Sequence, residues 1–174
     1  MAILPIKRFG DPVLRESAKP VDLFDDPLSK LADDMLETMY AAPGVGLAGP
    51  QVGVSLRLIV FDDGTGPRKL ANPELHDLKG EQEAEEGCLS IPGMYFPVKR
   101  ALSVRVTAIE LDGTPVVFDA EEFLARILQH ETDHVNGILF IDRLSTEDRK
   151  EAMRRIREQE LGLAGSGVDP SRAL

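Results

Sequence analysis

Two histidines four residues apart, with a glutamate beside the first, have the clearest chemical potential in this chain of 174 residues: His130, Glu131 and His134. On a helix, positions four apart lie one turn above each other, so both imidazoles can reach one cation. Glu131 lies one step round the helix and could handle protons on a water beside that cation. The pattern predicts a metal-dependent hydrolase. The alternative is a pair of core histidines satisfied by hydrogen bonds.

A third metal ligand has to come from elsewhere in the chain, because a catalytic metal usually takes three protein ligands and one water. One candidate is a downstream carboxylate such as Glu151. The other is Cys88, the only cysteine, which cannot form an intrachain disulfide and must act as a lone thiol or thiolate. A lone cysteine is more often an inert buried residue than a ligand, so the residues alone leave both candidates open.

A glycine-rich loop is the third feature, with the sequence GVGLAGPQ over residues 44–51. Three glycines and a proline would let its backbone approach an extended ligand closely. The loop lacks the Gly-Lys-Ser/Thr ending of a phosphate-binding loop. Its alternative is a plain connection from a helix to a strand.

Periodicity in the sequence predicts the elements that position these motifs. Helical spacing of apolar residues predicts helices over residues 25–42, 120–135 and 146–161. Alternation predicts strands at 55–62, 104–108 and 116–118, the last two joined by a hairpin turn. Because strands and helices do not alternate, we expect an α+β fold in which antiparallel sheets surround the metal-binding helix.

The predicted helix 120–135 carries two different stripes. Its histidines continue an apolar stripe that begins at Phe123 and Ile127. The second stripe is polar and consists of Arg126, Gln129, Asp133 and Asn136. We therefore expect the histidine stripe to face the interior of the protein.

Composition places the chain among ordinary globular proteins, with 43% hydrophobic and 29% charged residues. Its length predicts one domain over residues 1–161, followed by a flexible glycine-containing tail over 162–174. The net charge of −10 argues against a broad grip on nucleic acid or on an anionic membrane. The early apolar run 2–6 is too short for an export signal or a spanning helix, so a cytoplasmic location is expected.

Three segments together resemble the signature motifs of the peptide deformylase family. They are residues 44–51, which end in Pro50-Gln51, residues 86–90, which read EGCLS, and residues 129–134. The resemblance extends over about residues 6–144 and includes GDPVL at 10–14 and IPG at 91–93. One departure is Gly49, which stands where the family usually has a second alanine.

The resemblance implies an activity: removal of the N-formyl group from the initiator methionine of nascent polypeptides. It implies Cys88, His130 and His134 as ligands of one divalent ion, with water as the fourth. Fe²⁺ is the implied natural metal, and Zn²⁺, Ni²⁺ or Co²⁺ could replace it. Glu131 would be the acid/base residue. The Gln51 side chain and the Leu89 backbone N–H would stabilise the oxyanion.

The same resemblance assigns the substrate-binding backbone to Gly44, Val45, Gly46 and Gly87. A hypothesis from the residues themselves concerns Glu86, which would need a partner if it is buried beside the metal. Arg100 offers a planar, two-point match for that carboxylate. The alternative is an Arg100 side chain that is simply solvated after a strand.

Two rival classes of protein remain open at this point. One is a zinc peptidase in which His130, His134 and a downstream glutamate bind the metal. The other is a non-catalytic protein with a structural zinc site, which needs a fourth protein ligand. The only other histidine is His76, and it is expected on an exposed strand edge.

The last predicted helix carries five basic and five acidic residues over 147–160. Such a mixture is typical of a solvated helix with local ion pairs. A contact between this helix and the ribosome is implied only by the family.

Gly49 leads to an expectation about stability. A residue before proline is pushed towards extended backbone angles, where alanine is sterically welcome. Replacing Gly49 with alanine would then stabilise the fold by roughly 0.4–1 kcal/mol, because the unfolded chain loses freedom.

Overall fold

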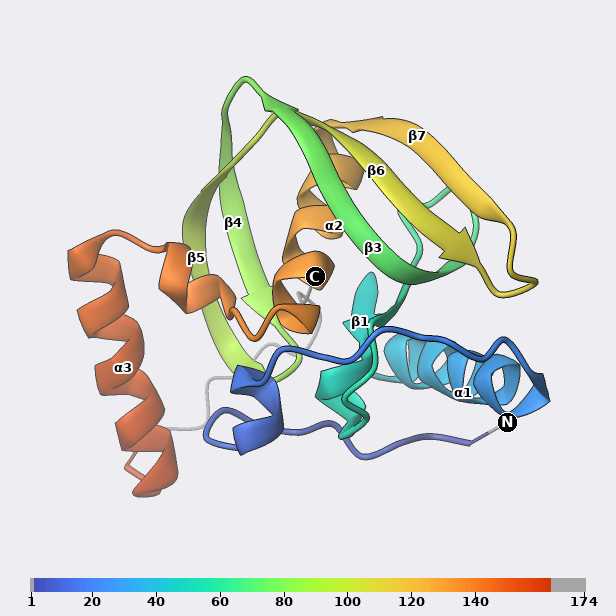
Figure 1. The fold of residues 1–174 in the computed structure, drawn as a ribbon. Helices are drawn as coiled ribbons and strands as arrows, with labels where there is room; N and C mark the ends of the chain where they lie inside the picture. Colours follow the sequence, from blue (N-terminus) through green and yellow to red (C-terminus); the bar gives the residue numbers. More distant parts are fainter. Residues whose placement is uncertain (1, 164–174) are drawn as a thin grey trace.

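Seven β-strands and three α-helices make up the computed structural model, which describes residues 2–163 (Figure 1). The helices are α1 (Asp26–Ala41), α2 (Glu122–Val135) and α3 (Thr146–Glu160). The strands are β1 (Gly46–Ala48), β2 (Leu58–Phe61), β3 (Arg68–Lys79), β4 (Gln82–Cys88), β5 (Ile91–Arg100), β6 (Ser103–Glu110) and β7 (Pro115–Glu121). The predicted α+β class is confirmed, and all three predicted helices are present within two residues of their expected bounds.

Two antiparallel sheets enclose α2. One has five strands in the order β1-β2-β3-β6-β7, and the other is the β4–β5 hairpin. Figure 1 shows α2 running between them, while α1 packs below the larger sheet and α3 stands beside β5. Since β4 ends at Cys88, this arrangement brings the cysteine segment alongside the histidine helix.

Helix α1 is capped by its own sequence and packs against β2 through its buried apolar residues. The side chain of Asp25 accepts a hydrogen bond from the Leu28 N–H at 3.0 Å and so caps the first turn. Ala32, Met35 and Met39 follow at helical spacing and are fully buried. They pack with β2 in one apolar cluster, which anchors the chain just before the glycine-rich loop.

The sequence analysis predicted no strand over β4 and β5, and for β3 it expected only a strand edge around His76. β4 contains exposed acidic residues, and β5 contains Pro92 and Pro97. In a two-stranded hairpin, each strand bonds to one neighbour only, so a missing N–H on the open side costs little. The predicted strand 55–62 is shorter than expected and is buried on both faces.

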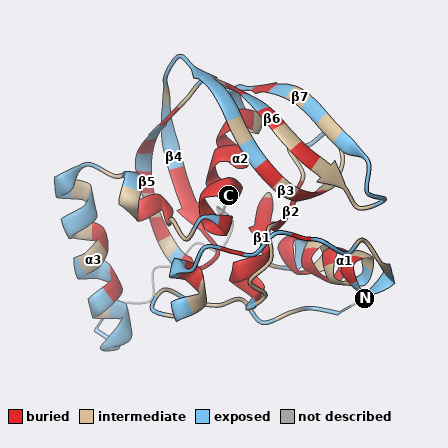
Figure 2. Cartoon of the chain, in the orientation of Figure 1, coloured by how far each residue is buried: buried red, intermediate tan, exposed pale blue. Residues whose placement is uncertain are grey.

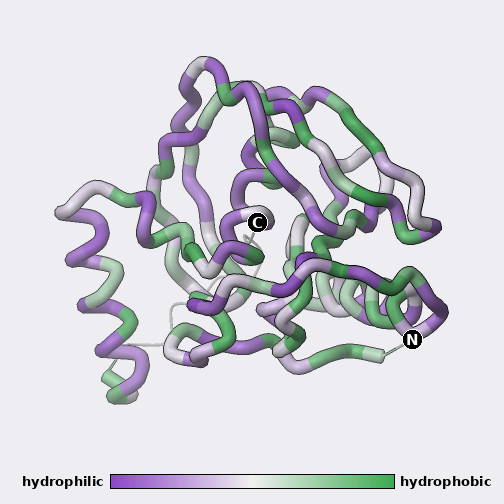
Figure 3. The backbone as a smooth tube through the Cα atoms, viewed as in Figure 1, coloured by the Kyte–Doolittle hydropathy of each residue, from purple (hydrophilic) through white to green (hydrophobic). Residues whose placement is uncertain are grey.

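The histidine stripe of α2 faces the interior as expected at Ile127, His130 and His134, which are at most 2% exposed, but the polar stripe is buried as well. Arg126, Gln129 and Asp133 are at most 8% exposed, whereas Phe123 is 45% exposed. Figures 2 and 3 show this as a helix that is largely hydrophilic in sequence and yet buried along most of its length. The polar side chains are tolerated because they have partners: the Gln129 amide, for example, exchanges hydrogen bonds of 3.0 Å with the Ala101 backbone.

Helix α3 is mostly exposed and carries the local ion pairs that its sequence predicts (Figure 2). Glu151 pairs with Arg154 and Arg155, and Arg154 also pairs with Glu158. None of the helices within residues 2–163 has the length and apolar character needed to cross a membrane. The predicted tail lies outside the described residues from position 164 onward.

The surroundings of Gly49 contradict the expectation that alanine at this position stabilises the fold. It opens the short 3-10 helix Gly49–Val52, which carries Gln51. A Cβ atom at Gly49 would lie 2.7 Å from the Leu56 carbonyl oxygen and 2.9 Å from that of Val54. Both neighbours are backbone atoms, so the chain itself would have to move. Glycine is therefore required here by a close backbone approach and not by an unusual φ.

We predict that Gly49→Ala lowers the free energy of unfolding by roughly 1–3 kcal/mol, the usual cost of overpacking. Thermal unfolding of the metal-loaded protein measures this directly. A melting temperature equal to or above that of the parent would contradict the close approach of Gly49 to the Val54 and Leu56 carbonyls.

Candidate metal centre

Cys88, His130 and His134 meet in the interior, and the ligand atoms that they offer all lie within 4.8 Å of one another. The Cys88 Sγ is 3.3 Å from the His134 Nε2, and the two imidazole centroids are 5.0 Å apart. All three side chains are at most 2% exposed. The sequence-predicted ligands are thus brought together by the end of β4 and the last two turns of α2.

Several polar atoms at this point have no hydrogen-bond partner although they are buried. They include the His130 Nε2, the His134 Nδ1 and both carboxylate oxygens of Glu131. An unpartnered buried polar group is costly, so such a cluster is stable only if something else satisfies it. A divalent cation with its water would satisfy the His130 Nε2 and the Glu131 carboxylate together. One thiolate and two imidazoles form a donor set that suits Fe²⁺, Zn²⁺, Ni²⁺ or Co²⁺.

The orientation of His130 is fixed by the buried carboxylate of Glu86. The His130 Nδ1 lies 3.0 Å from the Glu86 Oε2, which leaves the Nε2 lone pair free for a metal. The predicted pairing of Glu86 with Arg100 is confirmed: two hydrogen bonds of 2.8 and 2.9 Å join the guanidinium to both carboxylate oxygens. Burial alone would raise the pKa of Glu86, but hydrogen bonds from Arg100 and His130 outweigh it and hold the pKa far below its usual range.

Sequence reasoning missed two partners of this carboxylate network. Arg126 donates a second charged hydrogen bond to the Glu86 Oε1 at 2.7 Å. Asp133 accepts from Arg100 at 2.7 Å and from Arg143 at 2.8 Å. Both residues belong to the polar stripe of α2, and a fully polar stripe on a helix predicted to be central was the signal that could have revealed them.

Glu131 faces the glycine-rich loop. A Cβ atom at Gly46 would lie only 2.2 Å from the Glu131 Oε1, so the absence of a side chain at Gly46 makes room for the carboxylate. A Cβ at Gly44 would lie 2.8 Å from the Leu89 Cδ1 in the same way. Val45 between them is half-buried against the apolar cluster under the larger sheet.

Burial shifts the protonation of the groups that surround the site. It raises the pKa of Glu131 to about 7, which suits a group that must exchange protons near neutrality. Burial, followed by the neighbouring His130 charge, lowers the pKa of His134 and favours the neutral imidazole that a metal requires. Burial alone would lower the pKa of His130. The interactions with the Cys88 sulfur and the Glu86 carboxylate outweigh burial and raise this pKa above its usual value.

Gln51 connects the glycine-rich loop to the cysteine segment. Its Oε1 accepts the Ala48 N–H at 2.9 Å, which holds the side chain in place. Its Nε2 points at the Cys88 Sγ at 3.6 Å and at the Ser90 Oγ at 3.3 Å. The amide therefore presents a donor beside the metal ligands, next to the buried segment that contains Gly87 and Leu89.

The additional metal ligands that a zinc peptidase or a structural zinc site would need do not lie beside these three residues. Glu151 belongs to α3, where it pairs with arginines of the same helix. His76 lies on β3 at a stretch that pairs with β6 alone, because β2 pairs only with residues 68–71, so it occupies the expected exposed strand edge. Its Nε2 is 3.0 Å from the Thr107 Oγ1. The described residues supply three ligands and one adjacent glutamate, which is the composition of a catalytic site with an open position.

The fold and the site together define a metal-dependent hydrolase with two histidines and a glutamate on one helix. Comparison with known proteins makes this specific, because the family model described as polypeptide deformylase matches residues 3–150. The chain belongs to this family, and it removes the N-formyl group from the N-terminal methionine of newly synthesised polypeptides, releasing formate.

Individual relatives agree with this assignment along nearly the whole chain. A peptide deformylase from Acidothermus cellulolyticus is 52% identical over 160 residues, which cover 92% of this chain and 89% of the relative. One from Azotobacter vinelandii is 50% identical over 163 residues, 91% of this chain and 97% of the relative. Among solved structures, the peptide deformylase of Thermus thermophilus has a TM-score of 0.87 at 42% identity, and the match covers 92% of this chain and 97% of that one.

We predict that Cys88→Ser lowers metal content and turnover together, because a neutral hydroxyl cannot replace a thiolate ligand. Metal analysis and formyl-peptide hydrolysis on one sample measure both quantities. Glu151→Gln is the control and should change neither. A serine variant that keeps its metal while losing turnover would instead make Cys88 a covalent nucleophile.

We predict that Arg100→Ala lowers the free energy of unfolding by roughly 3–5 kcal/mol, because Glu86 and Asp133 both lose a buried cation. Metal affinity should fall roughly 10- to 100-fold, since Glu86 no longer holds the His130 ring firmly. Arg105→Ala removes a two-point pair with Asp119 on the exposed surface and should have little effect. Equal melting temperatures for Arg100→Ala and Arg105→Ala would contradict the claim that the buried ion pairs of Arg100 stabilise the fold more than an exposed pair does.

Proposed function

We propose that Cys88, His130 and His134 hold one Fe²⁺ ion and that Glu131, Gln51 and Leu89 carry out deformylation around it. The observation that carries this proposal is the combination of three converging ligand atoms with an unpartnered, buried glutamate at their side. When bound, the ion would polarise the formyl carbonyl and acidify a water molecule. One thiolate and two neutral imidazoles leave such an ion with a net charge of about +1, which preserves that ability.

Glu131 is proposed as the group that moves protons. Its carboxylate takes a proton from the attacking water and delivers it to the nitrogen that leaves as the new N-terminus. A pKa near 7 allows both steps at neutral pH without a large penalty for either form. The lack of a side chain at Gly46 leaves the space that this carboxylate occupies.

Gln51 and the Leu89 backbone are proposed as the donors for the developing oxyanion. The Gln51 amide is already oriented by its hydrogen bond from the Ala48 N–H, so little reorganisation is needed during the reaction. A single donor of this kind is worth roughly 3 kcal/mol in the transition state. The backbone of residues 44–46 and of Gly87 would hold the peptide in an extended conformation beside them.

The methionine side chain of the substrate has a suitable place next to Cys88. A cavity of about 170 Å³ opens there, and its apolar lining includes Leu89, Ile91 and Met94. An unbranched thioether side chain fits an apolar cavity of this kind, and it would leave the formyl group facing the ligand cluster.

The setting of this activity belongs to the same proposal. We place the enzyme in the cytoplasm, as one catalytic domain over residues 1–161, where formylated nascent chains arise. Any contact with the ribosome would use the exposed charged face of α3, which stands at the side of the molecule (Figures 1 and 2).

The proposed function is tested with a formyl-Met-Ala peptide and protein prepared without oxygen, since iron beside a thiolate is oxygen-sensitive. The parent should release formate, and replacing Fe²⁺ with Zn²⁺ should preserve the fold. Glu131→Gln should keep its metal but lose at least ~100-fold in rate, because no group then moves the proton.

Glu122→Gln, an exposed change on the same helix, serves as the control and should match the parent. An empty metal site in Glu131→Gln would show that Glu131 is a ligand. Hydrolysis of unformylated peptides by the parent would favour the peptidase class instead.

A further inference from the structure

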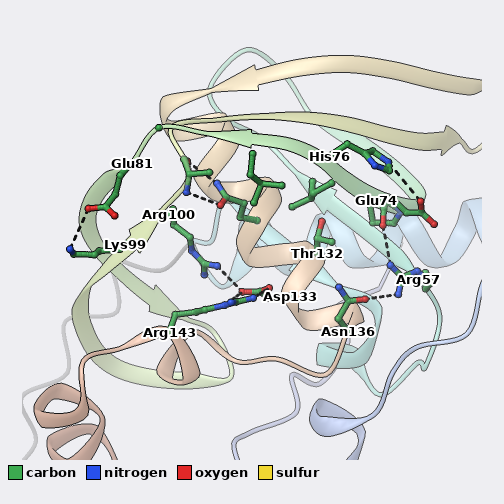
Figure 4. Close-up of a pocket in the computed structure, with 16 residues that line it drawn as sticks. Arg57, Glu74, His76, Glu81, Lys99, Arg100, Thr132, Asp133, Asn136 and Arg143 are labelled. Carbon is green, nitrogen blue, oxygen red and sulfur yellow. Dashed lines mark hydrogen bonds and ion pairs between the residues drawn. The ribbon is translucent and has the colours of Figure 1, made fainter.

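A second cavity, of about 690 Å³, is lined by one side of α2 and by β3 (Figure 4). Its floor is the polar stripe of the helix: Gln129, Thr132, Asp133 and Asn136. The metal centre uses residues 130, 131 and 134, which point away from this floor because successive helical residues are turned by about 100°. The two spaces therefore lie on different sides of one helix, connected through the Asp133–Arg100–Glu86 network.

One wall of this cavity is an irregular part of β3. The register with β6 shifts between Ala71 and Glu74 and again between His76 and Lys79. Within these two irregular stretches, Asn72 and Asp77 have φ values of 52° and 50°, a region that residues other than glycine rarely adopt. Bulges of this kind are frequent beside binding and active sites, where they redirect a strand.

Arg57 brings an uncompensated positive charge to one end of the floor. Its guanidinium donates to three neutral acceptors: the Asn136 Oδ1 at 2.8 Å, the Pro73 carbonyl at 3.0 Å and the Val135 carbonyl at 3.3 Å. It has no carboxylate partner anywhere in residues 2–163. Its charge is therefore balanced by no carboxylate of these residues, and an anionic ligand could supply that balance.

A second arginine stands at the other end of the floor. Arg143 pairs with Asp133, but Asp133 is shared with Arg100, so one carboxylate balances parts of two guanidinium charges. Arg143 also remains 45% exposed at its side chain and can turn towards a ligand. The acidic residues Glu74 and Glu81 lie at the rim, where they are about two-thirds exposed and face solvent.

Thr132 supplies an unpartnered donor on the floor of this cavity. The residue is 5% exposed, and its hydroxyl has no hydrogen-bond partner. Figure 4 shows it on the helix between the Arg57 and Arg143 side chains. A buried hydroxyl without a partner is unfavourable for the protein alone, whereas an oxyanion would accept its hydrogen bond.

Part of the lining of this cavity is apolar. It includes Pro73, Leu75, Leu78 and Ala101, so a ligand that reaches the arginines would also bury hydrocarbon. The volume lies in the range of sites for small organic molecules. The lining thus combines cationic and hydroxyl donors with apolar side chains.

We propose that this cavity binds a small amphipathic anion, with a carboxylate or phosphate head between Arg57, Thr132 and Arg143 and an apolar body against β3. Guanidinium groups match either head with two parallel hydrogen bonds. The site is distinct from the one that binds the formyl-peptide.

The test uses the metal-loaded enzyme with octyl phosphate and with octanoate, which share the oxyanion and differ in its type. Calorimetry should detect binding of at least one of them, and 1-octanol should bind at least ~10-fold more weakly. Whichever anion binds more tightly identifies the head group. Failure of both anions to bind, or equal affinity for the alcohol, would overturn the proposal.

Three variants locate the site. Arg57→Gln should weaken binding of the anion by at least ~10-fold, while Arg157→Gln, the same change on an exposed arginine of α3, should leave it unchanged. Thr132→Val removes only the hydroxyl and keeps the shape. It should weaken binding ~5- to 10-fold and leave the melting temperature of the free enzyme equal or higher.

The threonine variant keeps the test decisive if Arg57→Gln folds poorly, because no intramolecular hydrogen bond is lost. Anion binding that both changes leave unaltered would place the ligand at the metal centre and overturn the proposal. A fall in the melting temperature of ligand-free Thr132→Val would do the same, since it would mean that the hydroxyl serves the fold.

Discussion

The carboxylate of Glu86 is the point on which the interior of this protein depends. It is fully buried and accepts charged hydrogen bonds from Arg100 and Arg126 while it orients the His130 ring. A buried carboxylate without these partners would cost several kcal/mol, so the hairpin that carries Glu86 and the helix that carries Arg126 must come together for either to be stable. The polar helix α2 can occupy the centre of an α+β domain because this network satisfies it.

The same network explains how a hydrolytic site is built at the junction of two sheets. Cys88 lies at the end of β4 in the β4–β5 hairpin, and the histidines lie on α2. Gln51 lies on a 3-10 helix after β1. Each comes from a different structural unit, and each unit is held to the others by buried polar contacts as well as by apolar packing. Preorganised donors and ligands of this kind lower the reorganisation needed during catalysis.

The sequence was sufficient to predict those parts of the protein that follow from short-range periodicity or from motifs. The histidine spacing on α2 predicted the metal site, and the resemblance of three motifs added Cys88 as the third ligand. Long-range contacts could not be read in this way. The burial of Arg126 and Asp133 was not predicted, because burial of a polar stripe depends on partners distant in sequence. Gly49 was misjudged because the Val54 and Leu56 carbonyls that exclude a side chain are brought close only by the fold.

The way in which the β4–β5 hairpin is attached to α2 has a consequence for metal exchange. A metal held by Cys88 and by two residues of α2 closes a large loop of chain, and in many small metalloproteins such a link is what keeps the fold together. Here the ion pairs Glu86–Arg126 and Arg100–Asp133 already join the same two elements. These pairs hold the hairpin against α2 through the protein's own side chains, independently of the metal ligands. We therefore expect that exchange of one divalent ion for another leaves the surrounding chain in place, so that folding does not select the metal.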